Sequence, residues 1–125
     1  MTDYSLDSSF VINFLGGNQK ATRWLEGRTD EDRFFLPSLA EAEVRRGVDD
    51  LGEFEKLEVQ ELGSEEAKLF SEISKELRSK GSSAGALDCL IAATAASNSS
   101  VLVSFDSDFK TMKGISGVRP EILDE

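Results

Sequence analysis

Acidic side chains occur at four places where this chain is expected to end a strand or begin a helix. The acids of interest are Asp7 in LDSSFVINFL, Glu43 in AEAEVRRG, Asp88 in GALDCLIAATAA, and Asp106 and Asp108 in SFDSDF. Such positions can converge at one edge of a parallel sheet, where ligands gather outside the carboxyl ends of the strands. Carboxylates gathered without a histidine or thiolate cluster favour a hard, oxygen-seeking cation, Mg²⁺ or Mn²⁺.

Asp88 is the most informative of these acids because it stands in a run that is otherwise small, apolar or weakly polar. Its neighbours at helical spacing are Ile91, Ala92 and Ala95, which places a carboxylate on a core-directed face. Burying an isolated carboxylate is costly, so this group must be exposed, paired or bound to a cation. The ordinary alternative is a first-turn acid that complements the helix dipole.

The other acids also have ordinary structural explanations. Asp7 could cap the helix that follows it, and the acids of SFDSDF could simply form a turn. Ser38 and Glu41 fit a capping box, which gives Glu41 a structural role. Glu43 has no such role, and its alternative is a charge on the helix flank that pairs with a nearby arginine.

Composition excludes several kinds of catalysis. The chain has 125 residues, no histidine and one cysteine, Cys89. Histidine-based acid–base catalysis, Ser-His or Cys-His pairs and His-ligated zinc are therefore excluded. A single cysteine allows no intramolecular disulfide, and the acidic N-terminus shows no secretory signal, so we expect a cytoplasmic protein. No apolar run is long enough to span a membrane, and we expect no membrane partner.

The formal net charge is −10, from 24 acidic and 14 basic residues. Such a surface attracts cations and repels nucleic acid. Two explanations of this charge are possible: it keeps the protein soluble, or it is the acidic surface typical of proteins from a high-salt cytoplasm.

Hydrophobic patterning predicts alternating strands and helices. Strands are expected at Tyr4–Leu6, Arg33–Leu36, Leu57–Leu62 and Ser100–Phe105. Helices are expected after Ser8, after Asn18, from Ser38 to about Asp50, from Ser64, and over the Asp88 segment. This alternation predicts an α/β fold with a central, mainly parallel sheet flanked by helices, in a single domain over residues 1–125.

Four segments, in order, resemble the signature segments of PIN-domain ribonucleases, and most closely those of VapC-type toxins of type II toxin–antitoxin modules. The segments are LDSSFVINFL, AEVRRG, LDCLIAATAA and LVSFDSDF. Val44 and Cys89 depart from the usual leucine and small residue, but neither replaces an acid.

The resemblance implies a PIN-like fold and an endoribonuclease that hydrolyses RNA phosphodiester bonds with Mg²⁺ or Mn²⁺. Asp7, Asp88 and Asp106 would be the principal metal ligands, directly or through water. Asp108 would support these ligands without contacting the metal, or would bind a second metal ion. Glu43 would hold a metal-bound water or act as a base.

The resemblance also implies contacts to substrate and partners. Ser8 or Ser9, and Ser104, match the hydroxyl residues of the family's segments. Arg45 and Arg46 flank Glu43, and Lys110 and Lys113 follow Asp108, so these cations are candidates for phosphate contacts, with plain surface solvation as the alternative. VapC-type toxins are typically homodimers, neutralised by a cognate antitoxin that covers the acidic pocket.

Two other functions fit the sequence less well. A non-catalytic PIN-fold module that binds metal or RNA is disfavoured because all the acids are present. A phosphate-handling receiver domain would need an acid pair after the first strand and an aspartate that ends a central strand. Only Asp7 follows the first strand, so this function is disfavoured as well.

Overall fold

The computed structural model describes residues 1–124 and contains a five-stranded sheet in which every neighbouring pair is parallel. The strands are β1 (Asp3–Leu6), β2 (Arg33–Pro37), β3 (Glu58–Gln60), β4 (Val101–Ser104) and β5 (Pro120–Ile122). Their order in the sheet is β3-β2-β1-β4-β5. The predicted α/β fold with a parallel sheet is confirmed.

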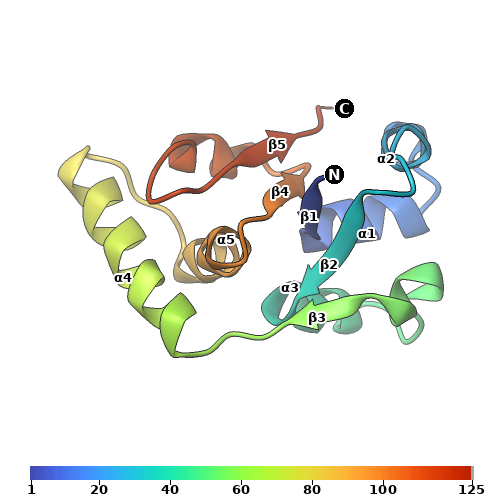
Figure 1. The fold of residues 1–125 in the computed structure, drawn as a ribbon, viewed down its shortest axis with the longest axis horizontal. Helices are drawn as coiled ribbons and strands as arrows, with labels where there is room; N and C mark the ends of the chain where they lie inside the picture. The colour runs from blue at the N-terminus through green and yellow to red at the C-terminus, as the bar shows by residue number, and fades with distance from the viewer. Residues whose placement is uncertain (125) are drawn as a thin grey trace.

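Helices cover both faces of this sheet. They are α1 (Ser8–Leu15), α2 (Gln19–Glu26), α3 (Ser38–Arg45), α4 (Ser64–Ser79) and α5 (Ala86–Ser97), with short 3₁₀ helices η1 (Gly52–Lys56) and η2 (Ser107–Met112). Figure 1 shows α1 and α2 on one side of the strands and α4 and α5 on the other. No helix among residues 1–124 is long and apolar enough to cross a membrane.

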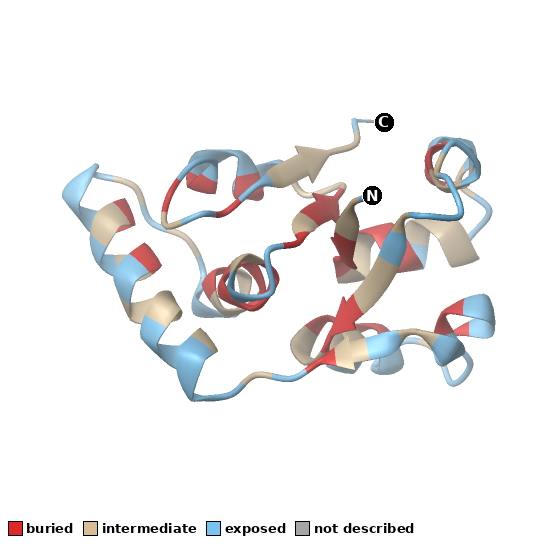
Figure 2. Ribbon diagram, viewed as in Figure 1, coloured by how far each residue is buried: buried red, intermediate tan, exposed pale blue. Residues whose placement is uncertain are grey.

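Two apolar clusters hold the helices against the sheet. One joins β1 and β2 to α1, α2 and α3, with Phe10 and Leu36 at its centre. The other joins β4 to α4, α5 and η2, with Leu102 and Phe109 fully buried. Figure 2 shows that buried residues gather in β1, β4 and α5. Strands that are buried on both faces consist of short apolar runs, and this pattern predicts the strand at β4 from the sequence.

The pairing of β1 with β4 at the centre of the sheet matters most for function. Leu6 pairs with Val103, and the next amide, that of Asp7, donates to the Val103 carbonyl at 2.9 Å. The chain segments that follow the two strands, one with Asp7 and the other with Asp106, therefore leave the same edge of the sheet side by side.

The structure corrects several expected boundaries. α3 ends at Arg45 rather than near Asp50, and Asp50 instead forms a turn in which it accepts a hydrogen bond from the Gly52 amide at 2.8 Å. β3 is shorter than predicted. β5 was not predicted, since three residues beginning with a proline carry little strand signal.

Candidate active site

Three of the five predicted acids meet within a few ångströms. One carboxylate oxygen each from Asp88, Asp106 and Asp108 lies within 4.8 Å of the others. Asp88 is in the first turn of α5, and the other two follow β4. Residues far apart in the sequence are thus brought together at the carboxyl edge of the sheet, as predicted.

Asp106 also forms the predicted turn. Its Oδ1 accepts a hydrogen bond from the Asp108 amide at 2.9 Å, which caps η2. The turn and the acidic cluster are therefore not alternatives, because Asp106 and Asp108 take part in both.

Asp7 is buried, with 4% of its surface exposed. Although it precedes α1, its side chain makes no capping bond, so the capping explanation is wrong for this residue. Instead Oδ2 accepts hydrogen bonds from the hydroxyls of Ser9, at 2.8 Å, and Ser104, at 2.7 Å. The other carboxylate oxygen accepts no hydrogen bond from residues 1–124, which leaves it available to a ligand.

The same two hydroxyls connect Asp7 to the backbone after β4. Ser9 Oγ accepts from the Phe105 amide, and Ser104 Oγ accepts from the Asp106 amide, both at 2.9 Å. The network fixes the Asp7 carboxylate relative to the loop that carries Asp106. Sequence reasoning placed Ser104 and Ser9 near the site but missed this role, because only the β1–β4 pairing brings the two serines together.

Glu43 is held from the neighbouring helix. The Ser8 hydroxyl donates to Glu43 Oε1 at 2.9 Å, which links α1 to α3. Glu43 forms no ion pair with an arginine among residues 1–124, so the alternative of a paired charge on the helix flank is wrong, and so is the capping box of Ser38 and Glu41. The cap position of α3 is Pro37, which makes no side-chain cap bond, and Glu41 instead accepts from Arg45.

The five acids share one electrostatic environment. Burial raises the pKa of Asp88 to about 6, and the negative charges of Asp106, Asp7, Glu43 and Asp108, in that order, add to the shift. Asp7 and Glu43 are not members of the group within 4.8 Å, yet they lie near enough to act on Asp88. A carboxyl group perturbed by burial and by four like charges is typical of a functional site.

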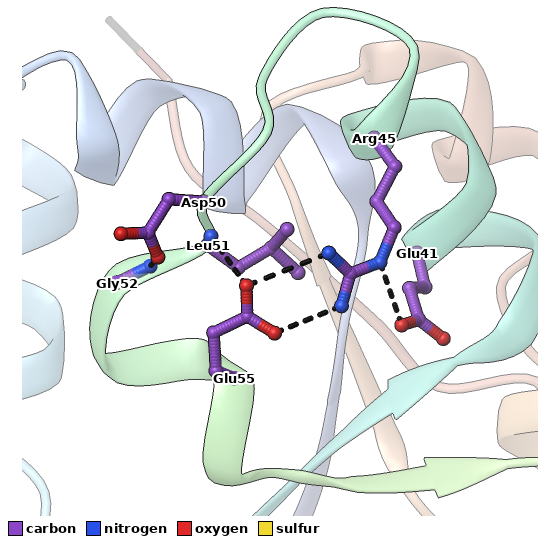
Figure 3. A network of polar contacts seen from close by, with 6 residues as sticks. All are labelled: Glu41, Arg45, Asp50, Leu51, Gly52 and Glu55. Carbon is purple, nitrogen blue, oxygen red and sulfur yellow. Dashed lines mark hydrogen bonds and ion pairs between the residues drawn. The ribbon is translucent and has the colours of Figure 1, made fainter.

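The two arginines predicted to contact phosphate, Arg45 and Arg46, differ in their ion-pair partners. Arg45 donates to Glu41 at 2.9 Å and reaches both carboxylate oxygens of Glu55, which ties α3 to η1 (Figure 3). Arg46 is exposed and has no ion-pair partner within residues 1–124. Their contact with phosphate stays a prediction.

Lys110, in η2, pairs loosely with Asp124, with 3.7 Å between Nζ and Oδ1. Lys113, at the end of η2, is exposed. Both side chains have freedom to reach a phosphate, and this too stays a prediction.

The donor set fits a hard divalent cation. The chain has no histidine, and its one cysteine is buried among apolar residues of the second cluster. The site therefore offers carboxylate and hydroxyl oxygens, which suit Mg²⁺ or Mn²⁺. Burial, and then the charges of the neighbouring acids, raise the pKa of Asp88, and a bound cation would offset both effects.

Comparison with known proteins identifies the family of this chain. The family model described as "PIN domain" matches residues 4–115. The chain belongs to the PIN-domain family. The matched range contains all five acids of the site. A search of curated proteins finds no match to this sequence.

Solved structures share the same fold. A chain of VapBC2 from Rickettsia felis bound to a promoter DNA fragment gives a TM-score of 0.82 at 21% identity, over 98% of this PIN domain and 100% of that chain. DNA-bound VapBC from Salmonella typhimurium gives 0.77 at 22% identity, over 98% of each. FitAcB from Neisseria gonorrhoeae gives 0.77 at 21%, over 94% and 95%. At these identities the likeness shows the fold.

Proposed function

We propose that this PIN domain is a Mg²⁺- or Mn²⁺-dependent endoribonuclease, the toxin of a VapC-type toxin–antitoxin pair, and that residues 1–125 form one domain. The observation that carries the catalytic part is the meeting of Asp88, Asp106 and Asp108 around shared space, with Asp7 and Glu43 close by. The family supports a nuclease, and the fold shared with VapBC complexes supports the toxin.

Asp88, Asp106 and Asp108 would hold the cation, and Asp7 would reach it through the carboxylate oxygen that the serines leave open. When bound, a divalent cation supplies a Lewis acid that polarises the phosphodiester and makes an attacking water more acidic. The Ser9 and Ser104 hydroxyls keep Asp7 in one orientation. Positioning of this kind is worth about 10–100-fold in metal affinity or activity in other metal sites.

Glu43 is the residue best placed to handle the proton. Ser8 donates to one of its carboxylate oxygens, so the second oxygen is available to accept a proton from the water that attacks phosphorus. In this assignment Ser8 positions the base rather than binding substrate. Arg46, Lys110 and Lys113 would contact flanking phosphates, and Arg45 could do so only by leaving Glu41 and Glu55.

The acidic site also suggests what kind of protein partner would bind there. An open cluster of carboxylates suits an arginine or lysine of a cognate antitoxin, which would take the place of the cation. A homodimer in the cytoplasm is the assembly we propose for the toxin. The neighbours described as toxin–antitoxin complexes support the antitoxin partner.

RNA cleavage by the purified protein tests the proposal. A panel that includes structured tRNA is incubated with Mg²⁺ or Mn²⁺, from low to high salt, and with EDTA as a control. We expect cleavage that needs the metal and is lost in Asp88→Asn and Asp7→Asn. Asp30→Asn removes the same charge from an exposed loop and should cleave normally. Equal activity in all four proteins would remove the acids from the mechanism, and metal binding without cleavage would favour a binding module.

A further inference from the structure

A groove between α4 and α5 lies beside the acids and has no assigned role. It encloses about 420 Å³, within the usual 300–1,000 Å³ of pockets that hold small organic groups. Its walls come from α4 from Phe70 onward, the connecting segment and the start of α5; α4 and α5 lie side by side in Figure 1. The lining is Phe70, Ser71, Ser74, Leu77, Arg78, Ser82, Ser83, Ala84, Ala86 and Cys89.

The lining combines three kinds of chemistry. Phe70 is half-buried, so part of its ring faces the groove, and Leu77 and Cys89 form apolar walls. Ser71 and several neighbouring serines bring hydroxyls that can donate or accept hydrogen bonds. Arg78 is exposed at the rim, and no carboxylate of residues 1–124 lies within ion-pair distance of it.

The groove continues toward the acidic cluster. Ser83 and Ala84 line both this groove and a second hollow of about 390 Å³, whose other walls are Gly85, Asp108 and Thr111. Asp108 belongs to the acidic cluster. When one phosphate of a polymer lies at the acidic cluster, the neighbouring unit of the same polymer can therefore lie in the groove.

We propose that the groove between α4 and α5 binds a nucleobase of the RNA next to the phosphate that is cleaved. This rests on the proposed function, since it names a subsite for the same substrate. An aromatic ring with apolar walls stacks a base, and serine hydroxyls match the polar edges of bases. An unpaired arginine on a chain of net charge −10 fits the phosphate of that nucleotide better than it fits an apolar peptide.

Binding of short single-stranded RNA tests the subsite. Fluorescence anisotropy is measured on the full chain with Ca²⁺ in place of Mg²⁺, using one labelled RNA and a set in which each position in turn is abasic. We expect one abasic position to weaken binding by at least about fivefold, the usual contribution of a stacked base. That loss should disappear in Phe70→Leu, which has no ring, and persist in Phe70→Tyr, which keeps it.

Arg78 has a matched control on the same helix. Arg78→Gln should weaken binding to every probe and lower the salt dependence by about one counterion, whereas Lys75→Gln, exposed and outside the groove, should not. Circular dichroism checks that every variant is folded.

The outcomes separate this inference from the proposed function. If the wild type cleaves RNA and Phe70→Leu keeps the full abasic effect, the subsite is refuted while the nuclease stands. If the base effect depends on the ring but no RNA is cleaved, the groove binds a nucleobase and the proposed nuclease activity is refuted. If Phe70→Leu leaves RNA binding unchanged but converts a dimer to a monomer in light scattering, the groove is an interface between copies and the inference is overturned.

Discussion

Replacing Asp88 with asparagine is expected to stabilise the metal-free protein. The folded state holds a proton on Asp88 more tightly than the unfolded chain does, because burial and four nearby acids raise the pKa of this carboxyl group to about 6 from an unfolded value of 3.8. Between these values the folded state binds more protons, so stability falls as pH rises and stays reduced above about pH 6. Asparagine keeps the shape of the side chain and removes the charge.

The size of the effect follows from the same shift. About two pKa units correspond to about 3 kcal/mol at 1.36 kcal/mol per unit. Asp88 is only partly buried, so solvent screening reduces this to about 1.5–2 kcal/mol. The carboxylate also interacts favourably with the N-terminus of α5 by about 0.3–1 kcal/mol, which asparagine loses. The net gain is about 1 kcal/mol, or about 4 °C in melting temperature for a chain of this length.

Thermal unfolding in EDTA measures this gain. At pH 8 Asp88→Asn should melt above the wild type, and the two should converge below about pH 4, where Asp88 is protonated in both the folded and the unfolded state. Saturating Mg²⁺ should reverse the order, because only the wild type has its full set of carboxylate ligands. Asp30→Asn controls for the general loss of one charge. If Asp88→Asn melts at or below the wild type at pH 8 in EDTA, the carboxylates do not repel one another as argued.

Three further substitutions test other parts of the structure. Ser104→Ala removes a hydrogen bond to Asp7 and should weaken Mg²⁺ binding about tenfold or more in calorimetry, and unchanged affinity would contradict the positioning role. Gln60→Leu breaks buried bonds to Ser5 and Ser100 and should cost about 2–3 kcal/mol in urea unfolding; a smaller loss would mean that water replaces them. Glu55→Gln should leave the melting temperature nearly unchanged, since the Arg45–Glu55 pair is exposed and a glutamine oxygen can still accept from the Leu51 amide; a large drop would show that the ion pair in Figure 3 holds η1 in place.

The sequence predicted the central strands and the long helices because their patterns are strong and local. The first three residues of β4, VLV, are a continuous apolar run, and α4 repeats apolar residues at helical spacing. β5 and the two 3₁₀ helices were missed because they are too short to show a period. The end of α3 was placed too late, since the Asp50 turn depends on a side chain that can favour either a helix end or a loop.

The acids of the site were found by residue type and order, whereas their supports were not. Convergence of Asp88 with Asp106 follows from a general property of parallel sheets. The contacts of Ser8 with Glu43 and of Ser9 with Asp7 depend on how α1 packs against α3 and β4, which no local pattern encodes. For the same reason sequence could not tell that Arg45 would be held by two carboxylates.

The two edges of the sheet have a consequence for the free protein in solution. Both edge strands, β3 and β5, contain only three residues. An exposed edge recruits other chains through its unpaired backbone groups, so short edges offer little template for intermolecular strand pairing. Together with the high negative charge, which makes copies repel one another, this should keep the folded chain from aggregating edge to edge even when no partner covers it.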